Sequence, residues 1–455
     1  MLKRKIDDRF TSWKNNPDHL PLVVEGARQV GKTTSIETFA RKAYKAFYNL
    51  NFFSDPGLMS IFDGALDPES IITRITIAFP SQEYVPGSTL ILLDEIQHCP
   101  NARTALKFLA RHADFDVVAS GSLLGISLSD KASLPVGYSE TIMMHPLDFE
   151  EFLWAMDIGE KVISGLKSCF DERRPVDDYV HQRMLDYFAM YTVTGGMPAV
   201  VASFAKERDY SKVLRLQRGI VADYRKDAVK YAEGSEKVKV VRCLDSIPAQ
   251  LAKANKKFQY SVVEKKASSR KYGDSLLWLE DAGIVNLCRN LSRIDSPLAG
   301  FSKDNEFKLY FNDTGLLISM YEDGTARRIV EGEMGIYKGA IYENIVASAL
   351  AALDMPLFYF APSDTLEIDF VINFRGRPCI LEVKSGENTK SKSLNTVLGN
   401  PKYNVDQAIR LSRKNVGEEG AILALPLYMV IFLKPADNES WMPPLASSDD
   451  LESHM

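Results

Sequence analysis

The sequence predicts an α/β protein. It begins with a parallel sheet covered by helices, followed by a helical region, a winged-helix segment and a second, C-terminal α/β domain. Over residues 20–145, short apolar strands alternate with helical segments, an order that favours a parallel sheet. A glycine-rich loop joins the first strand to the first helix, and two acids end a later apolar strand. Both features are typical of a phosphate-binding α/β fold.

In the N-terminal part we expect strands at 22–24, 46–51, 89–93, 116–119 and 140–144, and a helix at 35–45 after the glycine-rich loop. The connection at 54–86 is long and is broken by Pro56, Pro68 and Pro80. These elements define a first domain over residues 1–150.

A helical lid region is expected over 151–236, with helices at 148–156, 177–194 and 209–231 and a turn at 195–198. Residues 237–330 form the winged helix-turn-helix, with an amphipathic helix at 269–282, ended by Gly283, and a strand at 284–287. The C-terminal domain, 331–435, combines a helix at 339–352, strands at 357–360, 368–374 and 378–383, a helix near 405–413 and an apolar segment at 428–433. The polar tail at 436–455 is predicted to be disordered.

The composition is that of an ordinary globular protein. Of 455 residues, 45% are hydrophobic and 25% charged, and the net charge of −5 argues against bulk attraction to nucleic acid while leaving room for a local basic surface. The five cysteines form no C-x-x-C pair, which favours a reducing compartment and excludes a disulfide framework. No signal peptide or apolar run of about 20 residues is present, so we expect a cytoplasmic protein without a membrane segment.

The glycine-rich loop fits G-x-x-x-x-G-K-[ST], the Walker A pattern. Its backbone N–H groups and the helix N-terminus suit phosphate oxygens, Lys32 suits the β and γ phosphates, and Thr33 suits Mg²⁺. The predicted cofactors are therefore ATP and Mg²⁺. The nucleotide-binding set is Gly26, Ala27, Arg28, Gln29, Val30, Gly31, Lys32, Thr33 and Thr34, together with Asp94 and Ser120.

The strand at residues 90–93 ends in Asp94 and Glu95, the Walker B pattern. Asp94 is expected to bind Mg²⁺, and Glu95 to orient or deprotonate the attacking water. The alternative is a strand end with two solvated acids; the upstream loop favours the functional interpretation. A third strand ends in Ser120 and Ser122, which either contact the γ-phosphate or form a simple turn.

An arginine from a neighbouring subunit often completes such a site, which is compatible with a homo-oligomer. The candidates that the sequence offers are Arg28, Arg103, Arg111 and Arg225.

The C-terminal domain carries a second constellation. Asp369 lies on one predicted strand, and Glu382 and Lys384 share a face of the next, which gives the D-x(n)-E-x-K pattern of the PD-(D/E)XK nuclease fold. Two carboxylates suit Mg²⁺, and the ammonium suits the transition-state charge. Glu343 is a further candidate metal ligand, and Gln407, on the predicted following helix, would hold the lysine or the substrate. The alternative is a Glu–Lys salt bridge on a half-exposed strand.

A basic segment lies within the winged-helix region, with aromatic residues between its charges. A helix-turn-helix would place the helix near 268–281 in a major groove with lysines on phosphates. The alternative is a solvated face of a protein–protein adaptor. The basic residues are Lys253, Lys256, Lys257, Lys265, Lys266, Arg270 and Lys271.

Taken together, these stretches resemble bacterial and archaeal AAA-family ATPases that carry a C-terminal nuclease-like domain of unknown function. The resemblance covers residues 20–435. It implies ATP hydrolysis at Lys32, Thr33, Asp94 and Glu95, a winged-helix segment and a restriction-endonuclease-like C-terminal domain. The stretches that carry it lie at 26–34, 90–97, 119–123, 145–153, 194–198, 308–317, 339–347, 368–372 and 380–386.

The function that the sequence predicts is an ATPase that couples nucleotide state to DNA binding, with Mg²⁺-dependent DNA cleavage by the C-terminal domain as an added activity. The alternative is a non-cleaving nucleotide-dependent switch, in which the C-terminal domain binds protein partners.

Overall fold

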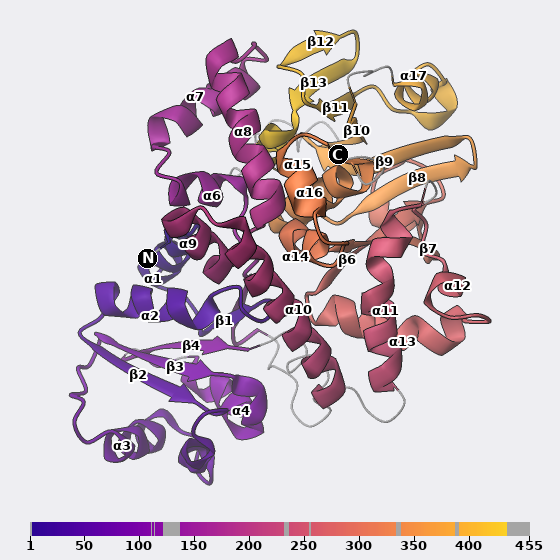
Figure 1. Ribbon diagram of the computed structural model, residues 1–455. Helices are drawn as coiled ribbons and strands as arrows, with labels where there is room; N and C mark the ends of the chain where they lie inside the picture. The colour runs from indigo at the N-terminus through magenta and orange to yellow at the C-terminus, as the bar shows by residue number, and fades with distance from the viewer. Residues whose placement is uncertain are drawn as a thin grey trace, which may run out of the picture.

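The computed structural model describes residues 2–110, 112, 114–121, 137–231, 236–253, 256–333, 338–386 and 391–434. Two sheets organise the chain, with a layer of helices between them (Figure 1). The predicted tail at 436–455, Arg111, Ser122 and the end of the 119–123 stretch lie outside the described residues.

The N-terminal sheet is parallel throughout, in the order β2-β3-β4-β1-β5. Its strands match the predicted ones to within one residue at either end. They are β1 (Leu22–Glu25), β2 (Ala46–Asn51), β3 (Thr89–Asp94), β4 (Asp116–Ser120) and β5 (Glu140–Met143). Because the strands are parallel, their carboxyl ends meet at one edge, where Asn51 pairs with Asp94 and Val24 with Ser120.

Alternate residues of the central strands face two separate cores. Leu22, Leu90 and Leu92 pack with α1 (Ile6–Asn15) and α2 (Lys32–Ala43). Val23 and Ile91 pack on the other face with α3 (Pro68–Ala78) and α4 (Pro100–Leu109). The period of two in side-chain direction along a strand thus covers both sheet faces with helices.

The long connection at 54–86 differs from the prediction, because it contains a 3-10 helix (Pro56–Phe62) and α3. Pro56 and Pro68 stand in the first turn of these helices, where the missing N–H has no intrahelical acceptor to lose. Asp55 and Asp67 cap them by accepting backbone N–H bonds. The prolines therefore start helices here rather than break them.

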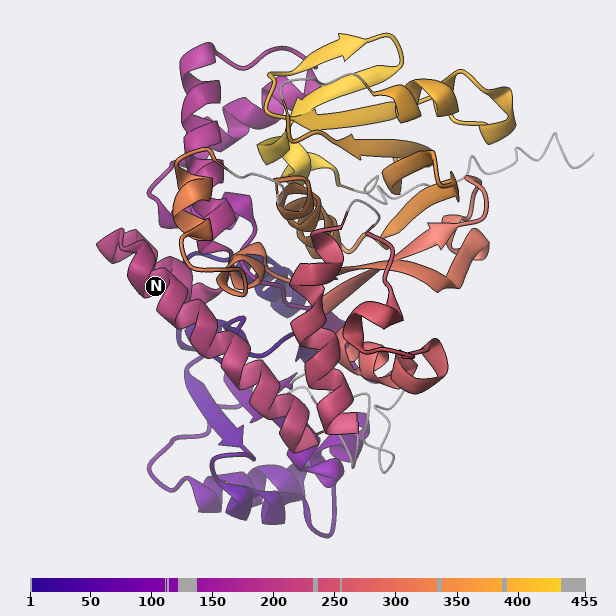
Figure 2. The same cartoon turned by 45° about the vertical axis from the view of Figure 1, so that its right-hand side comes forward.

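The three predicted helices of the helical region are present, and two further helices, at 160–171 and 198–207, were not predicted. The region consists of α6 (Phe149–Ala155), α7 (Glu160–Asp171), α8 (Asp178–Thr194), α9 (Pro198–Glu207) and α10 (Tyr210–Tyr231). A capping box between Asp148 and Glu151 begins α6. Helix α10 passes between the N-terminal sheet and the next group of helices (Figures 1 and 2).

The predicted winged-helix segment begins with three helices and a hairpin: α11 (Glu236–Leu251), α12 (Tyr260–Val263), α13 (Ser269–Asp281), β6 (Val285–Leu291) and β7 (Ser302–Phe311). A 3-10 turn (Leu298–Phe301) joins the two strands, and α14 (Thr314–Ser319) and α15 (Thr325–Val330) follow. Strand β6 pairs with β7 on one side and with β8 (Phe358–Ser363) on the other, so strands from both sides of the predicted boundary after residue 330 belong to one sheet.

The second sheet has eight strands in the order β12-β13-β11-β10-β9-β8-β6-β7. Its C-terminal members include β9 (Leu366–Phe374), β10 (Arg377–Val383), β11 (Ala408–Ser412), β12 (Gly417–Glu419) and β13 (Ile422–Pro426). The helices are α16 (Lys338–Ala352) and α17 (Lys392–Leu398), and the apolar segment at 428–433 is mostly a buried 3-10 turn (Leu427–Phe432).

The predicted helix near 405–413 is wrong, because these residues form β11. All five residues of β11 are buried, between β10 and β13. A strand covered on both faces loses the alternation that marks a strand, and a short apolar run of this kind cannot be told from a buried helix by its period.

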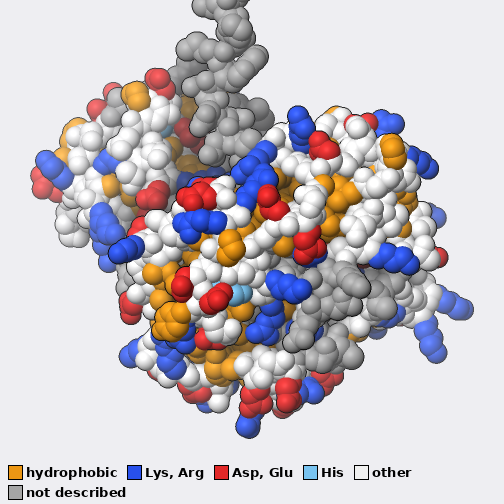
Figure 3. All heavy atoms as spheres, turned by 90° about the horizontal axis from the view of Figure 1, so that it is seen from above, with side chains coloured by type: hydrophobic (Ala, Val, Ile, Leu, Met, Phe, Trp, Pro, Cys, Tyr) orange, Lys and Arg blue, Asp and Glu red, His pale blue; other side chains and the backbone are white. Residues whose placement is uncertain are grey.

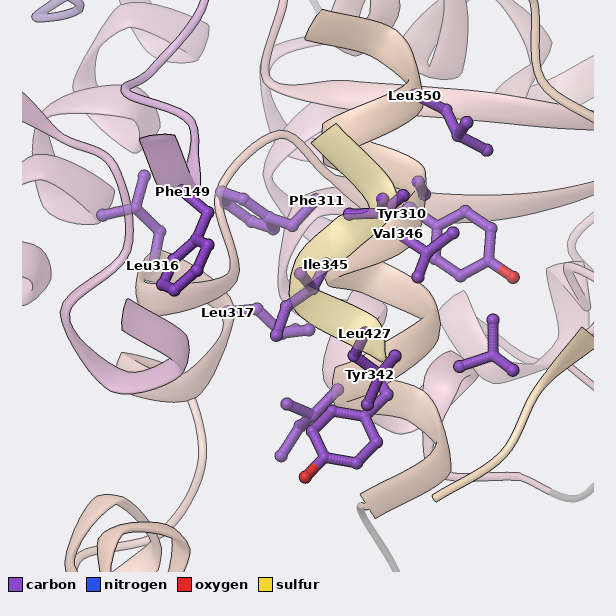
Figure 4. Close-up of a cluster of buried hydrophobic side chains, with 14 of the residues drawn as sticks. Phe149, Tyr310, Phe311, Leu316, Leu317, Tyr342, Ile345, Val346, Leu350 and Leu427 are labelled. Carbon is purple, nitrogen blue, oxygen red and sulfur yellow. The ribbon is translucent and has the colours of Figure 1, made fainter. Parts of the chain in front are cut away.

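Helix α16 joins the parts of the core. It is apolar on nearly all sides, and Figure 4 shows its Tyr342, Ile345 and Val346 between Leu427 and residues of β7 and α14. One continuous cluster of buried side chains includes the helical region, residues 237–330 and the C-terminal domain. These parts therefore share one large core, a smaller cluster lies between the second sheet and α17, and the N-terminal sheet has cores of its own.

Two stretches that carried the family resemblance meet at a buried turn. The Asp313 carboxylate accepts N–H bonds from Gly196 (2.5 Å) and Leu316 (2.8 Å). A Cβ at Gly195 would lie 2.3 Å from Asp313, and one at Gly315 would lie 2.4 Å from Gln217. The glycines are required because backbone and side chain approach each other too closely for any larger residue.

No helix in the described part of the chain is long and apolar enough to cross a membrane.

We predict a pH-dependent contribution of Asp313 to stability. Burial raises the pKa of Asp313 to about 6. The backbone N–H groups of Gly196, Leu316 and Gly315, which donate to the carboxylate, act in the opposite direction. The folded state thus holds the proton more tightly than the unfolded state does, so this stabilisation is complete below about pH 4 and is lost as the pH rises through about 6, on the order of 3 kcal/mol.

The measurement is the free energy of unfolding of the wild type minus that of Asp313→Asn, from denaturant titrations at pH 4 and pH 7. We expect this difference to fall as the pH rises. The exposed Asp304→Asn is the control and should show no such trend. A difference for Asp313→Asn that is constant with pH would contradict the prediction.

Candidate functional site

The Walker A loop leaves β1 and turns directly into α2. Gln29 and Gly31 take left-handed backbone conformations, with φ of 65° and 95°. Helix α2 begins at Lys32, three residues earlier than predicted, so the N–H groups of its first turn have no acceptor within the helix. This is the arrangement that binds phosphate at a helix N-terminus.

Lys32 is folded back into the loop. Its Nζ donates to the carbonyl oxygens of Gly26 and Ala27, each at 2.9 Å. Burial lowers the pKa of Lys32 to about 8, while the nearby Glu95 and Asp94 act in the opposite direction. The ammonium is thus held at the loop by two weak acceptors that a phosphate can replace.

The Asp94 carboxylate is the centre of a buried polar cluster at the sheet edge. Thr33 Oγ1 lies 3.2 Å from both of its oxygens, Asn51 Nδ2 donates to it at 2.7 Å, and the Ser120 hydroxyl also donates to it. Asp94 is only 2% exposed. The structure therefore brings together three predicted residues, Thr33, Asp94 and Ser120, and adds Asn51, which the sequence analysis missed.

Glu95 follows in a left-handed conformation with φ of 54°. Its carboxylate accepts a hydrogen bond from the Gln97 side chain and lies close enough to Lys32 to raise the pKa of that lysine.

Gln97 was also missed by the sequence analysis. The signal for Asn51 was a polar residue ending an apolar strand, but only the strand order places it beside Asp94.

The candidate arginines have different surroundings. Arg28 in the loop forms a 2.7 Å ion pair with Asp227 of α10. Arg103 is buried in α4 near Glu25, and Arg225 pairs with Asp245 of α11 at 2.8 Å.

A further arginine, Arg4, forms hydrogen bonds that hold the Walker A loop in place. It donates to the Val30 carbonyl (2.9 Å), the His145 carbonyl (2.8 Å) and the Glu151 carboxylate (3.0 Å), and only 7% of its side chain is exposed. It thus ties the loop to the end of β5 and to α6.

These residues fit a nucleoside triphosphate with Mg²⁺. A threonine hydroxyl and a carboxylate within 3.2 Å of each other are hard oxygen ligands of the kind that Mg²⁺ uses beside phosphates and water. In the described ranges no group of three or more His, Cys, Asp or Glu side chains is placed to hold a metal by protein ligands alone. A P-loop site does not need one, because nucleotide oxygens complete the shell.

The acids of the C-terminal constellation lie on the predicted helix and strands and have hydrogen-bond or ion-pair partners within the chain. Asp369 of β9 accepts the Val383 N–H at 2.8 Å, and Glu382 and Lys384 form an ion pair with each other. Glu343 of α16 accepts from Lys256 at 2.6 Å and from the Tyr310 hydroxyl at 3.0 Å.

A second buried lysine, Lys308 of β7, lies 3.8 Å from Glu343 and 2.5 Å from Glu367. Burial raises the pKa of Asp369 to about 7, helped by Glu343 and opposed by Lys308 and Lys256. The predicted ligands Glu343 and Asp369 are thus neighbours, but two ammonium groups already compensate them. Glu382 is turned to Lys384 instead.

Gln407 does not lie on a helix and does not contact the lysine. It stands just before β11 and donates to the Phe374 carbonyl at 3.0 Å. This prediction was wrong because it depended on the predicted helix near 405–413.

The basic segment is divided by its contacts. Lys256 is in the buried pair with Glu343, Lys257 pairs with Glu306 at 3.3 Å, and Lys271 pairs with Glu264 at 2.9 Å. Lys265, Lys266 and Arg270 are exposed around the start of α13. Of the predicted basic surface, Lys256 is therefore the member that is mostly withdrawn from solvent, with 16% of its side chain exposed, and ion pairs offset the charges of Lys257 and Lys271.

Comparison with known sequence families divides the chain into three parts. Residues 18–153 match the AAA domain family, residues 185–327 match a domain of unknown function (DUF8612), and residues 338–428 match another (DUF4143). No match was found among curated proteins.

Solved structures with a related arrangement share little sequence with the chain. A Walker-type ATPase of Pyrococcus abyssi is 12% identical with a TM-score of 0.43, over 70% of this chain and 96% of its own. The Orc1 protein of Aeropyrum pernix, solved in complex with DNA, is 14% identical (TM-score 0.28, coverage 72% and 94%). Cdc6p of Pyrobaculum aerophilum is 13% identical (TM-score 0.26, coverage 72% and 93%).

Likeness at this level assigns no function. The AAA domain match agrees with the Walker A loop, the Asp94 cluster and the parallel sheet. The C-terminal match is to a domain of unknown function, so the nuclease-like assignment has no support from it. The chain thus contains an AAA-type P-loop domain followed by two domains of unknown function.

We predict that Arg4→Ala destabilises the protein by about 3 to 5 kcal/mol, because it leaves the buried Glu151 carboxylate without its ion-pair partner. The neighbouring Lys3 pairs with Glu160 at the surface, with 59% of the lysine exposed, so Lys3→Ala should cost less than about 1 kcal/mol. Chemical denaturation of both variants checks this. Equal losses would show that the Arg4 contacts do not hold the fold together.

Proposed function

We propose that this protein binds and hydrolyses ATP with Mg²⁺ at the Walker A loop and couples the nucleotide state to DNA binding by residues 237–330. The observation that carries the ATPase part is the convergence of Thr33, Asp94 and Ser120 at one sheet edge, beside Lys32. Lys32 and the α2 N-terminus would hold the phosphates, and Thr33 and Asp94 would hold Mg²⁺. When bound, Mg²⁺ would neutralise part of the negative charge on the phosphates.

Glu95 is the proposed general base. It lies directly after the Asp94 cluster and close to Lys32, the residue proposed to hold the phosphates. Its hydrogen bond from Gln97 fixes the carboxylate at this position.

The proposed coupling runs through α10. Near its C-terminal end α10 contacts the loop, because the Tyr224 hydroxyl donates to the Arg28 carbonyl at 3.2 Å and Gln29 donates to Asp223 at 3.1 Å. The same turn contacts α11, where Arg225 donates to Asp245 at 2.9 Å. A change at the loop can therefore move the first helix of the proposed DNA-binding segment.

The proposed DNA-binding face is the start of α13. Lys265, Lys266 and Arg270 are exposed there and form no ion pair with any described residue. The face seen from above in Figure 3, by contrast, mixes Lys and Arg with Asp and Glu side chains. Three arginine and lysine side chains at the N-terminus of the third helix suit phosphate and base-edge contacts.

DNA cleavage is not part of this proposal. The predicted ligand Glu343 is bound to Lys256 and Tyr310, and Lys308 lies against it. A divalent cation at Glu343 and Asp369 would have to displace buried ammonium groups, which are already paired.

We predict that Glu95→Gln keeps the affinity for MgATP within about twofold and lowers kcat at least a hundredfold, the usual size of a lost general base. Titration calorimetry gives the affinity and phosphate release gives kcat. Glu83→Gln, an exposed position, is the control and should hydrolyse ATP as the wild type does. Unchanged turnover in Glu95→Gln would contradict the assigned role.

We further predict that the triple variant Lys265→Ala, Lys266→Ala, Arg270→Ala loses DNA affinity. The slope of log affinity against log salt should become less steep by about 0.9 for each DNA phosphate that the variant no longer neutralises. Fluorescence anisotropy with duplex DNA over a salt series, with and without MgATP, measures both quantities.

The matched control replaces three exposed basic residues on the helical region, Lys161, Lys206 and Arg215, by alanine. It carries the same change in net charge and should bind DNA nearly as the wild type does. Equal losses in the two variants, or no binding by the wild type, would reject α13 as the DNA-binding face.

A further inference from the structure

The loop residue Arg28 is held by an acid that comes from another part of the chain. Its Nη1 lies 2.7 Å from Oδ1 of Asp227, 199 residues later on α10. The Asp227 side chain is 11% exposed, whereas that of Arg28 is 31% exposed. Partial burial of the pair makes it more than a screened surface contact.

The electrostatic effects of Arg28 on neighbouring groups show which residues it lies near. It lies close enough to Lys32 to help lower the pKa of that lysine, and close enough to His98 to help lower the pKa of that histidine. Asp227 in turn lies near Glu95: burial raises its pKa first, and the Asp223 and Glu95 carboxylates add to this. Arg28, Lys32 and Glu95 therefore border one small region.

Acids and cations of α10 and the loop meet in this region. Asp223, Asp227 and Glu95 lie there with Arg28, and two lysines of α10 accompany them: Lys226 pairs with Asp223 at 2.8 Å, and Lys230 lies near Asp227. A triphosphate entering the loop brings negative charge to the same place. The guanidinium then has a second anionic partner within the reach of its side chain.

We propose that Arg28 is a phosphate-binding residue supplied by the loop itself, which exchanges its partner from Asp227 to the terminal phosphate when ATP binds. Asp227 is the positioning residue that holds Arg28 away until then. This inference depends on the proposed ATP binding. It gives the chain a cationic contact to the γ-phosphate without a second subunit.

The exchange also changes how α10 is held against the loop. When Arg28 leaves Asp227, the helix loses this ion pair and keeps the Tyr224 and Asp223 hydrogen bonds. ADP lacks the phosphate that competes with Asp227. The exchange therefore distinguishes ATP from ADP at the end of α10 that faces α11.

The experiment compares MgATP and MgADP binding by titration calorimetry in the full chain. In Asp227→Asn, Arg28 is released from its ion pair, so we expect MgATP affinity to rise about tenfold and MgADP affinity by no more than about twofold. Arg28→Ala should lower the affinity for MgATP at least tenfold and the affinity for MgADP much less. In the double variant the two changes should not add, and its affinity should equal that of Arg28→Ala.

Asp223→Asn is the matched control, because it removes the same charge four residues earlier on the same helix, where the carboxylate contacts Gln29 and Lys226 and the ion pair of Arg28 is with Asp227 instead. It should change the affinity for MgATP by no more than about twofold, because only a through-space charge interaction with the bound nucleotide is lost. A thermal melt of each variant verifies folding, and Arg28→Lys should restore part of the MgATP affinity.

Three outcomes overturn the inference: equal tightening of ATP and ADP by Asp227→Asn, the same tightening when Arg28 is alanine, or an equal effect of Asp223→Asn. Failure of the wild type to bind MgATP would instead reject the proposed function itself. The two failures are therefore distinguishable in one series of titrations.

Discussion

The N-terminal site depends on the need of a buried carboxylate for hydrogen-bond donors. Asp94 is 2% exposed at the tip of β3, where water cannot solvate it, and its neighbours supply the donors instead. Asn51 comes from β2 on one side, Ser120 from β4 on the other, and Thr33 from the start of α2. The parallel register makes this possible, because it ends all three strands at one edge. The polar cluster that satisfies Asp94 is also the set of oxygens that suits a hydrated dication.

The same requirement explains the partners of the acids in the C-terminal constellation. Glu343 is 4% exposed and Lys308 is completely buried, so neither charge is tolerable alone. Lys256 and Lys308 bring their ammonium groups to Glu343 from residues 237–330, and Tyr310 adds a hydroxyl. These partners are 87, 35 and 33 positions away in the chain, respectively. The arrangement joins two domains of unknown function through a buried ionic network, which favours a structural role for those acids in this state of the molecule.

The sequence correctly predicted those helices and strands that are determined by local sequence patterns. The strands of the first sheet, α6, α8, α10 and α13 lie within a few residues of their predicted positions, because apolar periodicity, caps and glycine ends are local signals. The prediction failed at β11, where burial on both faces removes the alternation, and at Gln407, which depended on it. It also failed to pair Lys256 with Glu343 and Arg28 with Asp227. Such pairs are fixed by tertiary packing over long separations, and no spacing rule in a single sequence contains them.

Helix α10 connects these observations. Gln217 and Tyr224 are seven residues apart, two turns of helix, and therefore lie on one face. Gln217 donates to the carbonyls of Val193 and Thr194, at the buried turn that Gly196 and Asp313 complete. Tyr224 donates to the Arg28 carbonyl in the Walker A loop. One face of one helix thus contacts both the phosphate loop and the turn that anchors the C-terminal core. Residues 185–327, which match a domain of unknown function, include this helix, so that domain itself contacts the Walker A loop. Under the proposed function, α10 is the element through which a change at the loop would reach the buried turn.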